Sequence, residues 1–389
     1  MTRLLFLAPG DVRKGRVEPI SWMKTCAALA DRGIDVRLVT LRVHWPDNIA
    51  LDHVWSHYGL QPRFRVQVLP TLLGPHASTA AFRLWGTGAS LALALTQLAR
   101  QAVRGGDLVV YSRSPALAAP FALLRRLLPS SRRPRLVLET HTLPPQRLRR
   151  LLRSVDLVVV NSLRLRNDAI AAFGLERDRV LHAPLGPFND VFPHAIREAR
   201  EELGLPLNAR FACYSGKMVE SQTEFLLQTA TGLRESGVRL LLVGGNPSIL
   251  EWTRRRIGEL GLGDTVIVAG FVEPSRVALY QAAADVLVLH MDHGFTHFPY
   301  ATPAKSYEYM AARRPIVATD IPLSDEVFGP DGERAIRIAE RTPGALAAGI
   351  VSALELPDGG SAMTERAATF VRDRSWARRV DALLEALPA

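Results

Sequence analysis

Hydrophobic and polar positions along this 389-residue chain alternate between two patterns. Short, nearly continuous apolar runs are typical of strands buried on both faces of a parallel sheet. Longer stretches between them, such as residues 20–32 and 223–236, are predicted to be helices. The predicted strands lie at residues 4–8, 36–40, 107–111, 135–139, 156–160, 209–215, 240–244, 266–269, 286–289 and 316–318. This order predicts an α/β protein with doubly wound parallel sheets.

The pattern is interrupted over residues 183–205, which are rich in Pro and Gly. A chain of this length usually exceeds one hydrophobic core, so we interpret the interruption as a linker between two domains. We expect a first domain over residues 1–190 and a second over residues 191–366. Residues 367–389 are expected to form a C-terminal amphipathic helix, interrupted around residues 373–375. Doubly wound domains bind ligands at the carboxyl ends of their strands, so the gap between the domains is the expected active site.

The stretch TPAKSYEYMAARRPIVATD, which begins at Thr302, is predicted to be a helix followed by a strand. Thr302 is the expected N-cap and Pro303 the first helical residue. Lys305 precedes Glu308 by three residues, an order that opposes the helix dipole and makes a poor structural ion pair. A diphosphate is expected against the N–H groups of Ala301 and Thr302, with Lys305 adding charge. Glu308 is expected to accept hydrogen bonds from a ribose diol, the alternative being an ion pair with a neighbouring arginine.

The composition, 48% hydrophobic and 22% charged, is that of an ordinary globular protein. Cys26 and Cys213 have no metal-ligand spacing and fit a reducing compartment, so we expect a cytoplasmic protein. The apolar run at residues 4–8 is too short for a signal peptide and is expected to be the first strand. The longest apolar stretch, GTGASLALALTQLA, falls short of a membrane span.

The formal net charge of +10 is unevenly distributed. Between Leu124 and Arg166 there are eleven arginines but only two acids, Glu139 and Asp156. Such a cluster attracts phosphates, anionic lipid or nucleic acid, and an Arg-rich solvated surface explains it equally well. Residues 144–153, PPQRLRRLLR, are predicted to form a basic amphipathic helix of the kind that lies on membrane surfaces.

Several motifs resemble those of the family 4 retaining glycosyltransferases. PAKSYEYMA followed by PIVATD resembles the donor-site segment of that family, and YSGKM, LLLVGGN and VIVAGFVEPSRVALYQAAADVLVLH resemble other parts of its donor domain. DLVVVNSLRLRNDAIAAFGLERDRVLHAPLGPFNDVF resembles the end of the acceptor domain. The resemblance covers nearly all of residues 1–375 and is strongest after Asp156. It implies the GT-B fold: two Rossmann-like doubly wound domains facing across a cleft, acceptor-binding and then donor-binding, with a C-terminal helix crossing back to the first domain.

The resemblance also implies roles for individual residues. His141 would touch the transferred sugar, Lys217 would contact the donor diphosphate, and Glu308 would hold the ribose. Phe271 and Val272 would meet the base through their backbone. The other positions implied to bind the donor are Gly15, Gly216, Gly244, Ala301, Thr302 and Lys305. Gly15 would lie in a loop that approaches the phosphate or the acceptor.

Two positions depart from the family pattern. Tyr300 stands where the family commonly has a glutamate, so His293 or Asp292 is the candidate replacement for holding the sugar hydroxyls. Gln222 stands where a second basic residue is usual, and Lys305 is expected to restore that phosphate charge.

The implied reaction transfers a sugar from a nucleotide-diphosphate sugar to an acceptor hydroxyl, with retention and without a metal or another cofactor. No D-x-D motif occurs in the chain. The acceptor is expected to be a lipid-linked or cell-envelope polysaccharide precursor, met by peripheral contact with the anionic inner face of the membrane, or else a small secondary metabolite. One alternative is a nucleotide-sugar 2-epimerase on the same fold, which needs paired carboxylates. Another is a non-catalytic binder of RNA or other anions, which the modest aromatic content of 7% disfavours. No nucleic-acid partner is expected.

Overall fold

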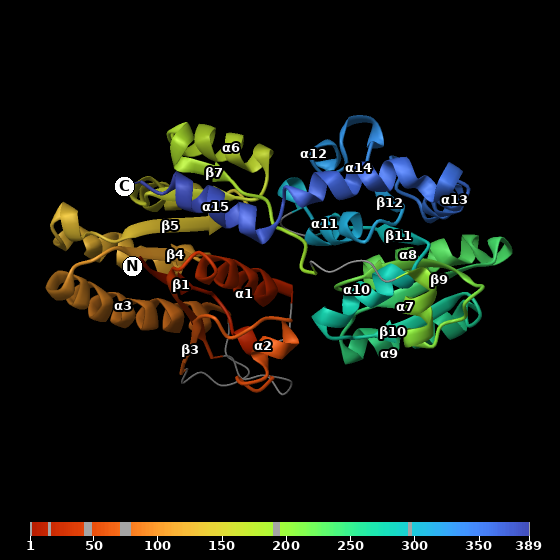
Figure 1. Cartoon of the computed structure of the whole chain (residues 1–389), viewed down its shortest axis with the longest axis horizontal. Helices are drawn as coiled ribbons and strands as arrows, with labels where there is room; N and C mark the ends of the chain where they lie inside the picture. The colour runs from red at the N-terminus through yellow and green to blue at the C-terminus, as the bar shows by residue number, and fades with distance from the viewer. Residues whose placement is uncertain are drawn as a thin grey trace. The chain divides into compact units, whose positions relative to one another are not determined.

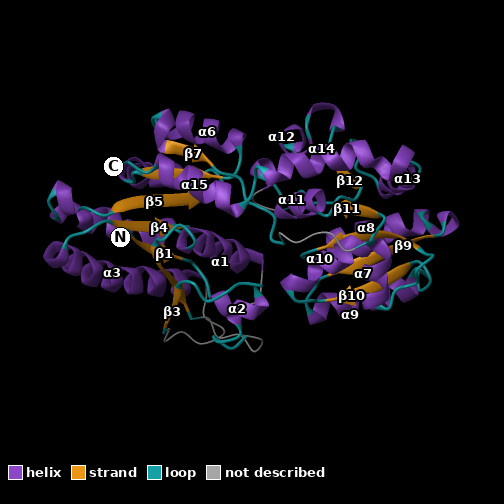
Figure 2. Cartoon of the chain, in the orientation of Figure 1, coloured by secondary structure: helices purple, strands orange, loops and turns teal. Residues whose placement is uncertain are grey.

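The computed structural model describes residues 2–14, 17–42, 49–70, 79–189, 195–294 and 298–388. The chain divides into two compact units, each built from strands and helices in alternation (Figures 1 and 2). Unit 1 consists of Met1–Leu185 together with Trp376–Ala389, and unit 2 consists of Gly186–Ser375.

In the described part of unit 1, seven parallel strands form a sheet in the order β3-β2-β1-β4-β5-β6-β7. The strands are β1 (Arg3–Leu7), β2 (Asp35–Leu41), β3 (Arg65–Leu69), β4 (Leu108–Ser112), β5 (Arg135–Thr140), β6 (Leu157–Val160) and β7 (Val180–His182). The helices are α1 (Val17–Ala30), α2 (Val54–His57), α3 (Thr79–Arg104), α4 (Pro115–Leu124), α5 (Arg149–Ser154), α6 (Leu163–Phe173) and α15 (Trp376–Ala386). Helix α15 comes from the end of the chain and packs against α1. The strand order reverses between β1 and β4, the kind of switch point at which such sheets bind ligands.

In the described part of unit 2, six parallel strands follow the order β10-β9-β8-β11-β12-β13, with the switch point between β8 and β11. The strands are β8 (Arg210–Ser215), β9 (Val238–Val243), β10 (Val266–Gly270), β11 (Val286–Leu289), β12 (Ile316–Thr319) and β13 (Ile336–Ile338). The helices are α7 (Ile196–Leu203), α8 (Glu220–Gly232), α9 (Pro247–Glu259), α10 (Pro274–Ala283), α11 (Ala304–Ala311), α12 (Ser324–Phe328), α13 (Pro343–Leu354) and α14 (Ser361–Arg372).

Both faces of the unit 2 sheet are buried, and β8 shows why its strands are apolar throughout. Successive side chains of a strand point to opposite faces. Ala212 and Tyr214 belong to a core that includes residues of α8, α9 and α13. Cys213, between them, belongs to a second core that includes residues of α11, α12 and α14. The predicted α/β architecture of two doubly wound parallel sheets is therefore confirmed.

Three strands were not predicted from the hydrophobic pattern: β3, β7 and β13. Each lies at an edge of its sheet, where one side of the strand is unpaired. In β3 no residue is fully buried, and the exposed positions break the apolar run on which strand prediction depends.

The boundary between the units, after Leu185, lies within residues 183–205, and two C-terminal helices flank residues 373–375. Residues 183–205 contain α7, whose Ala199 is buried against α10 of unit 2. The C-terminal region holds two helices, α14 and α15, and the chain passes from unit 2 to unit 1 between Ser375 and Trp376.

The longest described helix, α3, spans 26 residues and includes the stretch GTGASLALALTQLA. None of the helices in the described ranges combines the length and the apolar character that a membrane span requires.

Candidate functional site

Helix α11 brings Lys305 and Glu308 to the switch point of unit 2. The helix begins at Ala304, because Pro303 has an extended backbone with φ −60° and ψ 123° and serves as an N-cap without a side-chain bond. The prediction that Thr302 caps the helix is therefore wrong. Thr302 is instead buried and forms a side-chain hydrogen bond with Tyr307.

Lys305 lies against Tyr214 and Gly216 at the carboxyl end of β8. Its Nζ donates a hydrogen bond to Tyr214 Oη at 2.8 Å and lies 4.0 Å from the centroid of the Tyr214 ring. Desolvation lowers the pKa of Lys305 to about 7, although the nearby Glu308 carboxylate opposes this shift. The groups described in contact with the Lys305 ammonium, the hydroxyl and ring of Tyr214, carry no charge. An anion that binds here would therefore stabilise the charged form of Lys305.

Gly216 and Gly244 let two strand ends approach each other. Gly216 has a φ of 135°, and a Cβ on it would lie 2.8 Å from Lys305 Nζ. A Cβ on Gly244 would lie 2.0 Å from the carbonyl oxygen of Gly216. The Gly244 N–H donates to Gly270 O at 2.7 Å, so glycines end three adjacent strands. Backbone alone therefore forms this edge of the sheet.

Glu308 is buried and is held by a neutral amide. Gln281 Nε2, on α10, lies 3.2 Å from Glu308 Oε2 and donates to Ser215 Oγ at 3.0 Å. The Ser215 N–H donates to Tyr309 Oη at 2.9 Å. The buried Gln281 Oε1 has no hydrogen-bond partner among the described residues. These contacts link the end of β8 to α10 and α11.

His290, directly after β11, was not predicted as a site residue. It stacks on Phe225 with ring centroids 3.8 Å apart, and its Nδ1 lies 3.0 Å from Thr319 Oγ1. Burial, assisted by Arg341, lowers the pKa of His290 to about 3, so the ring is neutral at physiological pH. Gln222 Nε2 donates to the carbonyl of His290. Gln222 thus supports the loop that follows β11.

The two predicted replacements at the sugar hydroxyls, Asp292 and His293, follow in the same loop. The Gly294 N–H donates to Asp292 Oδ1 at 2.9 Å, and Ser221 Oγ donates to Asp292 Oδ2. These hydrogen bonds lower the pKa of the Asp292 carboxyl. Tyr300 is partly buried in a short 3-10 helix, Phe298–Tyr300.

The remaining predicted donor-binding residues of unit 2 differ in exposure. Lys217 is exposed, and its carbonyl accepts a hydrogen bond from Tyr214 Oη at 2.7 Å. Phe271 is 60% exposed, so it is not a core residue, while Val272 packs on the sheet. Ala301 is buried. Within the described residues, no three His, Cys, Asp or Glu side chains form a group that could hold a metal ion.

In unit 1, His141 lies directly after β5 and next to Arg113, which directly follows the adjacent strand β4. His141 Nε2 lies 2.7 Å from Glu139 Oε1, and Arg113 Nη2 lies 3.0 Å from His141 Nδ1. Burial and Arg113 lower the pKa of His141 to about 4, which keeps the ring neutral. The predicted donor-binding residue Gly15 lies outside the described residues.

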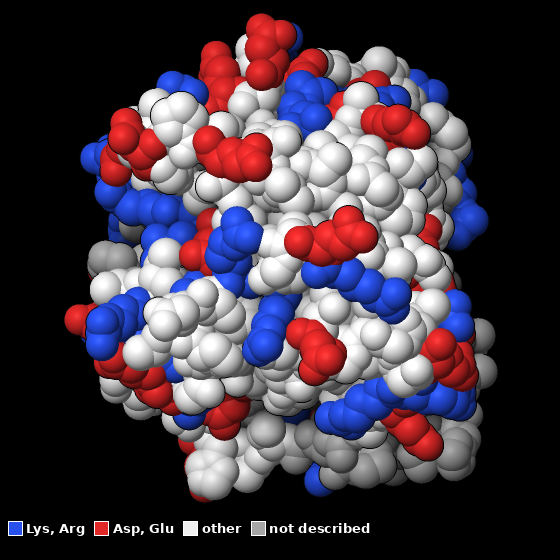
Figure 3. Space-filling model, turned by 90° about the vertical axis from the view of Figure 1, so that its right-hand side faces the viewer, with Lys and Arg blue, Asp and Glu red and all other residues white. Residues whose placement is uncertain are grey.

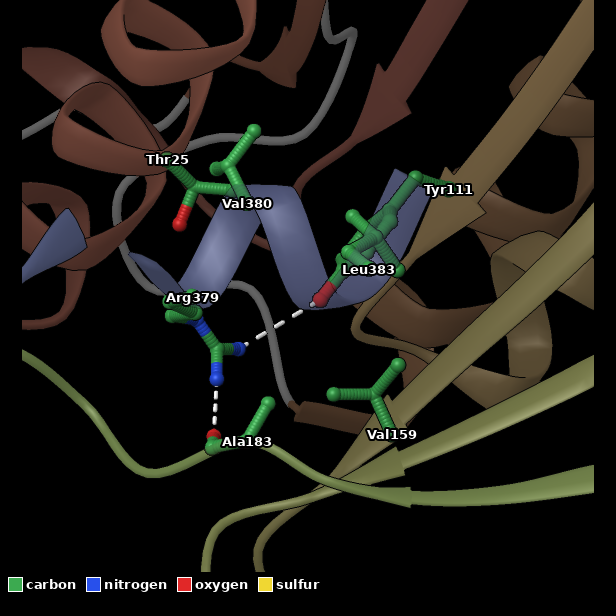
Figure 4. A pocket seen from close by; sticks show the side chains of 7 residues that line it. All are labelled: Thr25, Tyr111, Val159, Ala183, Arg379, Val380 and Leu383. Carbon is green, nitrogen blue, oxygen red and sulfur yellow. Dashed lines mark hydrogen bonds between the residues drawn. The ribbon is translucent and has the colours of Figure 1, made fainter. Parts of the chain in front are cut away.

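Glu139 is the centre of a buried ionic network in unit 1. Arg379, on α15, places its Nη2 2.9 Å from Glu139 Oε1, and Tyr111 donates to Glu139 Oε2. Arg379 also donates to the carbonyl of Ala183, and Figure 4 shows its guanidinium directed toward Ala183 and Tyr111. Burial alone would raise the pKa of Glu139, but Arg379 and Arg113 outweigh it and hold that pKa well below its usual range.

Sequence reasoning missed Glu139, Arg113 and Arg379 as site residues. A signal existed for Glu139, because residues two apart at a strand end lie on the same side, and Glu139 stands two before His141. Arg113 follows a predicted strand, which places it at the ligand-binding edge. Arg379 has no local signal, since only the folding of α15 onto unit 1 brings it there.

Most of the arginine cluster is bonded to unit 1 itself. The arginines that bind carboxylates or backbone carbonyls are Arg125, Arg132, Arg133, Arg135, Arg153, Arg164 and Arg166. Arg147, Arg149 and Arg150 are exposed, while Leu152 of the same segment is buried. The helix expected over residues 144–153 is shorter than predicted, because only Arg149–Ser154 is α-helical.

The face of the molecule in Figure 3 has a mixed charge. Basic and acidic side chains are interspersed there, so no continuous patch of one sign covers this face. A polyanion therefore has no broad basic surface to follow on this side.

The sequence of this chain is similar to glycosyltransferases. Residues 209–356, which carry the site of unit 2, match the family model described as "Glycosyl transferases group 1". The putative teichuronic acid biosynthesis glycosyltransferase TuaC of Bacillus subtilis is 30% identical over 132 residues, which are 34% of this chain and 30% of that protein. This chain spans 30% to 34% of the length of three curated relatives that it matches.

Solved structures resemble the chain over its whole length. Sucrose-phosphate synthase from Thermosynechococcus elongatus has a TM-score of 0.74 at 18% identity, covering 99% of this chain and 98% of that one. Anabaena HepE, solved in complex with UDP and glucose, has a TM-score of 0.71 at 18% identity, covering 100% and 99%. The chain therefore has the GT-B fold of two Rossmann-like units, as the resemblance implies.

Proposed function

We propose that this protein is a hexosyltransferase that moves a sugar from a nucleotide-diphosphate sugar to an acceptor hydroxyl. The observation that carries the proposal is the pairing of Lys305 and Glu308 on α11 beside the Gly216 turn. This arrangement lies at a switch point, within the segment that matches the glycosyltransferase family model. The structural neighbour HepE of Anabaena, solved in complex with UDP and glucose, supports a nucleotide-sugar donor.

The donor diphosphate would bind at the start of α11. The N–H groups at the start of α11, the Lys305 ammonium and the exposed Lys217 would stabilise the negative charge that develops on the leaving phosphate. Glu308 would accept hydrogen bonds from the ribose diol, and Phe271 and Val272 would meet the base. In this reading His141 of unit 1 contacts the transferred sugar.

The reaction we propose retains the anomeric configuration and needs no metal. The bond from the anomeric carbon to the phosphate oxygen breaks, and a bond to the acceptor oxygen forms on the same face of the sugar. The departing phosphate oxygen takes the acceptor's hydroxyl proton, so the nucleotide diphosphate leaves with it. Lys305 and Lys217 supply the positive charge that a divalent cation supplies in other transferases.

The acceptor we propose is anionic or lipid-linked. Arg147, Arg149 and Arg150 are exposed on one short basic segment, and this arrangement suits peripheral contact with an anionic membrane in the cytoplasm. The buried, free thiols of Cys26 and Cys213 fit a reducing compartment. Flotation with vesicles of neutral and of anionic lipid tests the contact. We expect binding to anionic vesicles alone, weakened in a variant with all three arginines replaced by serine; equal binding to both would contradict it.

A panel of nucleotide sugars tests the main proposal. We expect one donor to raise the melting temperature and to be consumed in the presence of an acceptor, with an unchanged rate in EDTA. The anomeric proton coupling of the product, measured by NMR, reports retention. Conversion of the donor without any acceptor would instead indicate an epimerase, and salt-dependent RNA binding without donor binding would indicate an anion-binding protein.

A further inference from the structure

Arg379 connects the last helix of the chain to the candidate sugar-contacting histidine. Its Nη2 lies 2.9 Å from Glu139 Oε1, and the same oxygen lies 2.7 Å from His141 Nε2. The side chains of Glu139 and Arg379 are only 3% and 4% exposed, whereas that of His141 is 23% exposed. Of these three residues, His141 is thus the one that a substrate can reach.

The charges of the network determine the hydrogen-bonding role of each partner. Four side chains surround the Glu139 carboxylate. Arg379 comes from α15, and Tyr111 and Arg113 come from the end of β4 and the residue after it. His141 follows the same strand as Glu139. Two guanidiniums beside one buried carboxyl keep it ionised, and an ionised carboxylate only accepts hydrogen bonds. His141 Nε2 must therefore carry the ring proton.

The other ring nitrogen is then defined as well. Arg113 Nη2 lies 3.0 Å from His141 Nδ1 and 3.2 Å from His141 Nε2. With Nε2 protonated in a neutral imidazole, only Nδ1 can accept, so Arg113 Nη2 donates to Nδ1. Arg113 is itself fixed by a hydrogen bond from its Nη1 to Ser21 Oγ on α1, at 2.6 Å. A sugar hydroxyl reaching the ring would donate to Nδ1, sharing that nitrogen with Arg113 or displacing it.

We propose that Glu139 and Arg379 are positioning residues, which hold His141 in the neutral Nε2–H tautomer so that Nδ1 accepts a hydrogen bond from a substrate hydroxyl. The proposal rests on the proposed function, because it assigns His141 a substrate contact. It gives α15 a part in the site of unit 1: Arg379 acts on Glu139, and Glu139 acts on His141.

A wholly structural role would make Arg379 a clamp for the chain segment before the unit boundary. Arg379 does donate to the carbonyls of Ala183 and Pro184, and that contact would survive in a variant that loses only the carboxylate. Glu139→Gln therefore separates the two roles: it keeps the shape of the side chain and removes the charge that selects the tautomer.

The decisive measurement is the 15N NMR spectrum of His141 in the full chain, recorded between pH 5 and 8. In the wild type we expect the neutral Nε2–H tautomer throughout this range, since the pKa of His141 is lowered to about 4 by burial and by Arg113. In Glu139→Gln and in Arg379→Met we expect a mixture of tautomers. Arg379→Lys keeps the charge and should restore most of the wild-type spectrum.

Kinetics give a second readout. We expect kcat to fall by about 10- to 100-fold in Glu139→Gln and in Arg379→Met, with the dissociation constant of the donor changed less than about twofold. The matched control is Asp381→Asn, also on α15, which breaks an exposed pair with Arg32 at 2.8 Å and should leave kcat unchanged.

The possible outcomes separate this inference from the proposed function. An unchanged His141 tautomer in both variants would overturn the positioning role, even if glycosyl transfer is observed. Absence of transfer with every donor would overturn the proposed function, while the NMR spectra would still decide the tautomer. A fall in kcat that is matched by Asp381→Asn would indicate that α15 acts only through folding.

Discussion

The candidate site residues of unit 1 and unit 2 differ in how their buried charges are balanced. In unit 1, the Glu139 carboxylate is surrounded by two guanidiniums, a phenol and an imidazole, so its charge is balanced within the protein. In unit 2, the described contacts of Lys305 are a tyrosine ring and its hydroxyl, with Glu308 three residues away. The first arrangement holds side chains in place, whereas the second leaves a cation whose charge an arriving anion would stabilise.

The largest effect should come from unbalancing the network of unit 1. Glu139→Ala leaves Arg379 buried without its carboxylate, and we expect a loss of about 3–5 kcal/mol in the free energy of unfolding. Urea denaturation measures it. The control is Asp168→Ala, which removes an exposed partner of Arg164 and should cost less than about 1 kcal/mol. Equal losses in the two variants would show that the network does not stabilise unit 1.

In unit 2, the corresponding carboxylate should matter for binding. Glu308→Ala removes the proposed acceptor of two ribose hydroxyls. Each charge-assisted hydrogen bond is worth about 1.5 kcal/mol, so we expect the donor to bind about 100-fold more weakly. Isothermal titration calorimetry measures the change. Glu251→Ala, at an exposed position of α9, is the control. Undiminished affinity in Glu308→Ala would place the ribose elsewhere.

Gly244, at the carboxyl end of β9 in unit 2, should tolerate no side chain. Gly244 has a φ of 124°, and its Cβ would collide with the Gly216 carbonyl, so Gly244→Ala should lower the free energy of unfolding by about 2–3 kcal/mol. Gly258→Ala is the matched control: that glycine lies within α9 with open space around it, and the substitution should stabilise by about 0.5–1 kcal/mol. A Gly244→Ala protein as stable as the wild type would refute the close packing.

Donor binding should depend on pH through Lys305. Its pKa of about 7 in the free protein rises when a diphosphate binds, so the complex takes up a proton above pH 7. We expect the affinity for the donor to fall as the pH rises from 7 to 9, by up to about tenfold per unit. Calorimetry in buffers of different ionisation enthalpy measures the uptake, which should disappear in Lys305→Met. Unchanged proton uptake in that variant would assign it to another group.

The same lowered pKa has the reverse consequence for folding. The unfolded chain binds a proton at Lys305 up to about pH 10.5, whereas the folded chain releases it near pH 7. Lys305 therefore lowers stability at neutral pH, and this penalty decreases as the pH rises between those two values. The wild-type free energy of unfolding, compared with that of Lys305→Met across the range, tests the sign.

The smallest effect should come from Lys217. The residue is exposed, where an ion pair contributes less than about 1 kcal/mol, so Lys217→Ala should weaken donor binding only about threefold. The difference should vanish at high salt because the charge is screened. A loss as large as that in Glu308→Ala would show that Lys217 becomes buried when the donor binds.

The sequence by itself determined the architecture, and it placed Lys305 and Glu308 on one helix. Apolar runs such as residues 286–289 and 209–215 predicted the central strands, because a strand buried on both faces must be apolar along its length. The proximity of Lys305 and Glu308 could also be predicted, because residues three apart on one helix lie on the same face. Edge strands such as β3 were missed because their exposed positions break the apolar run.

Only the tertiary structure decided the rest. Pro303 was predicted to begin the helix, but its extended backbone moves the start to Ala304. The partner of Glu139 lies 240 residues further along the chain, on α15, which follows unit 2 in sequence but belongs to unit 1. Local periodicity carries no information about such a contact. From the sequence alone, an arginine on an amphipathic helix is predicted to face the solvent, because the element that packs against the helix is not known. The burial that makes Arg379 a partner of Glu139 is a property of the folded unit.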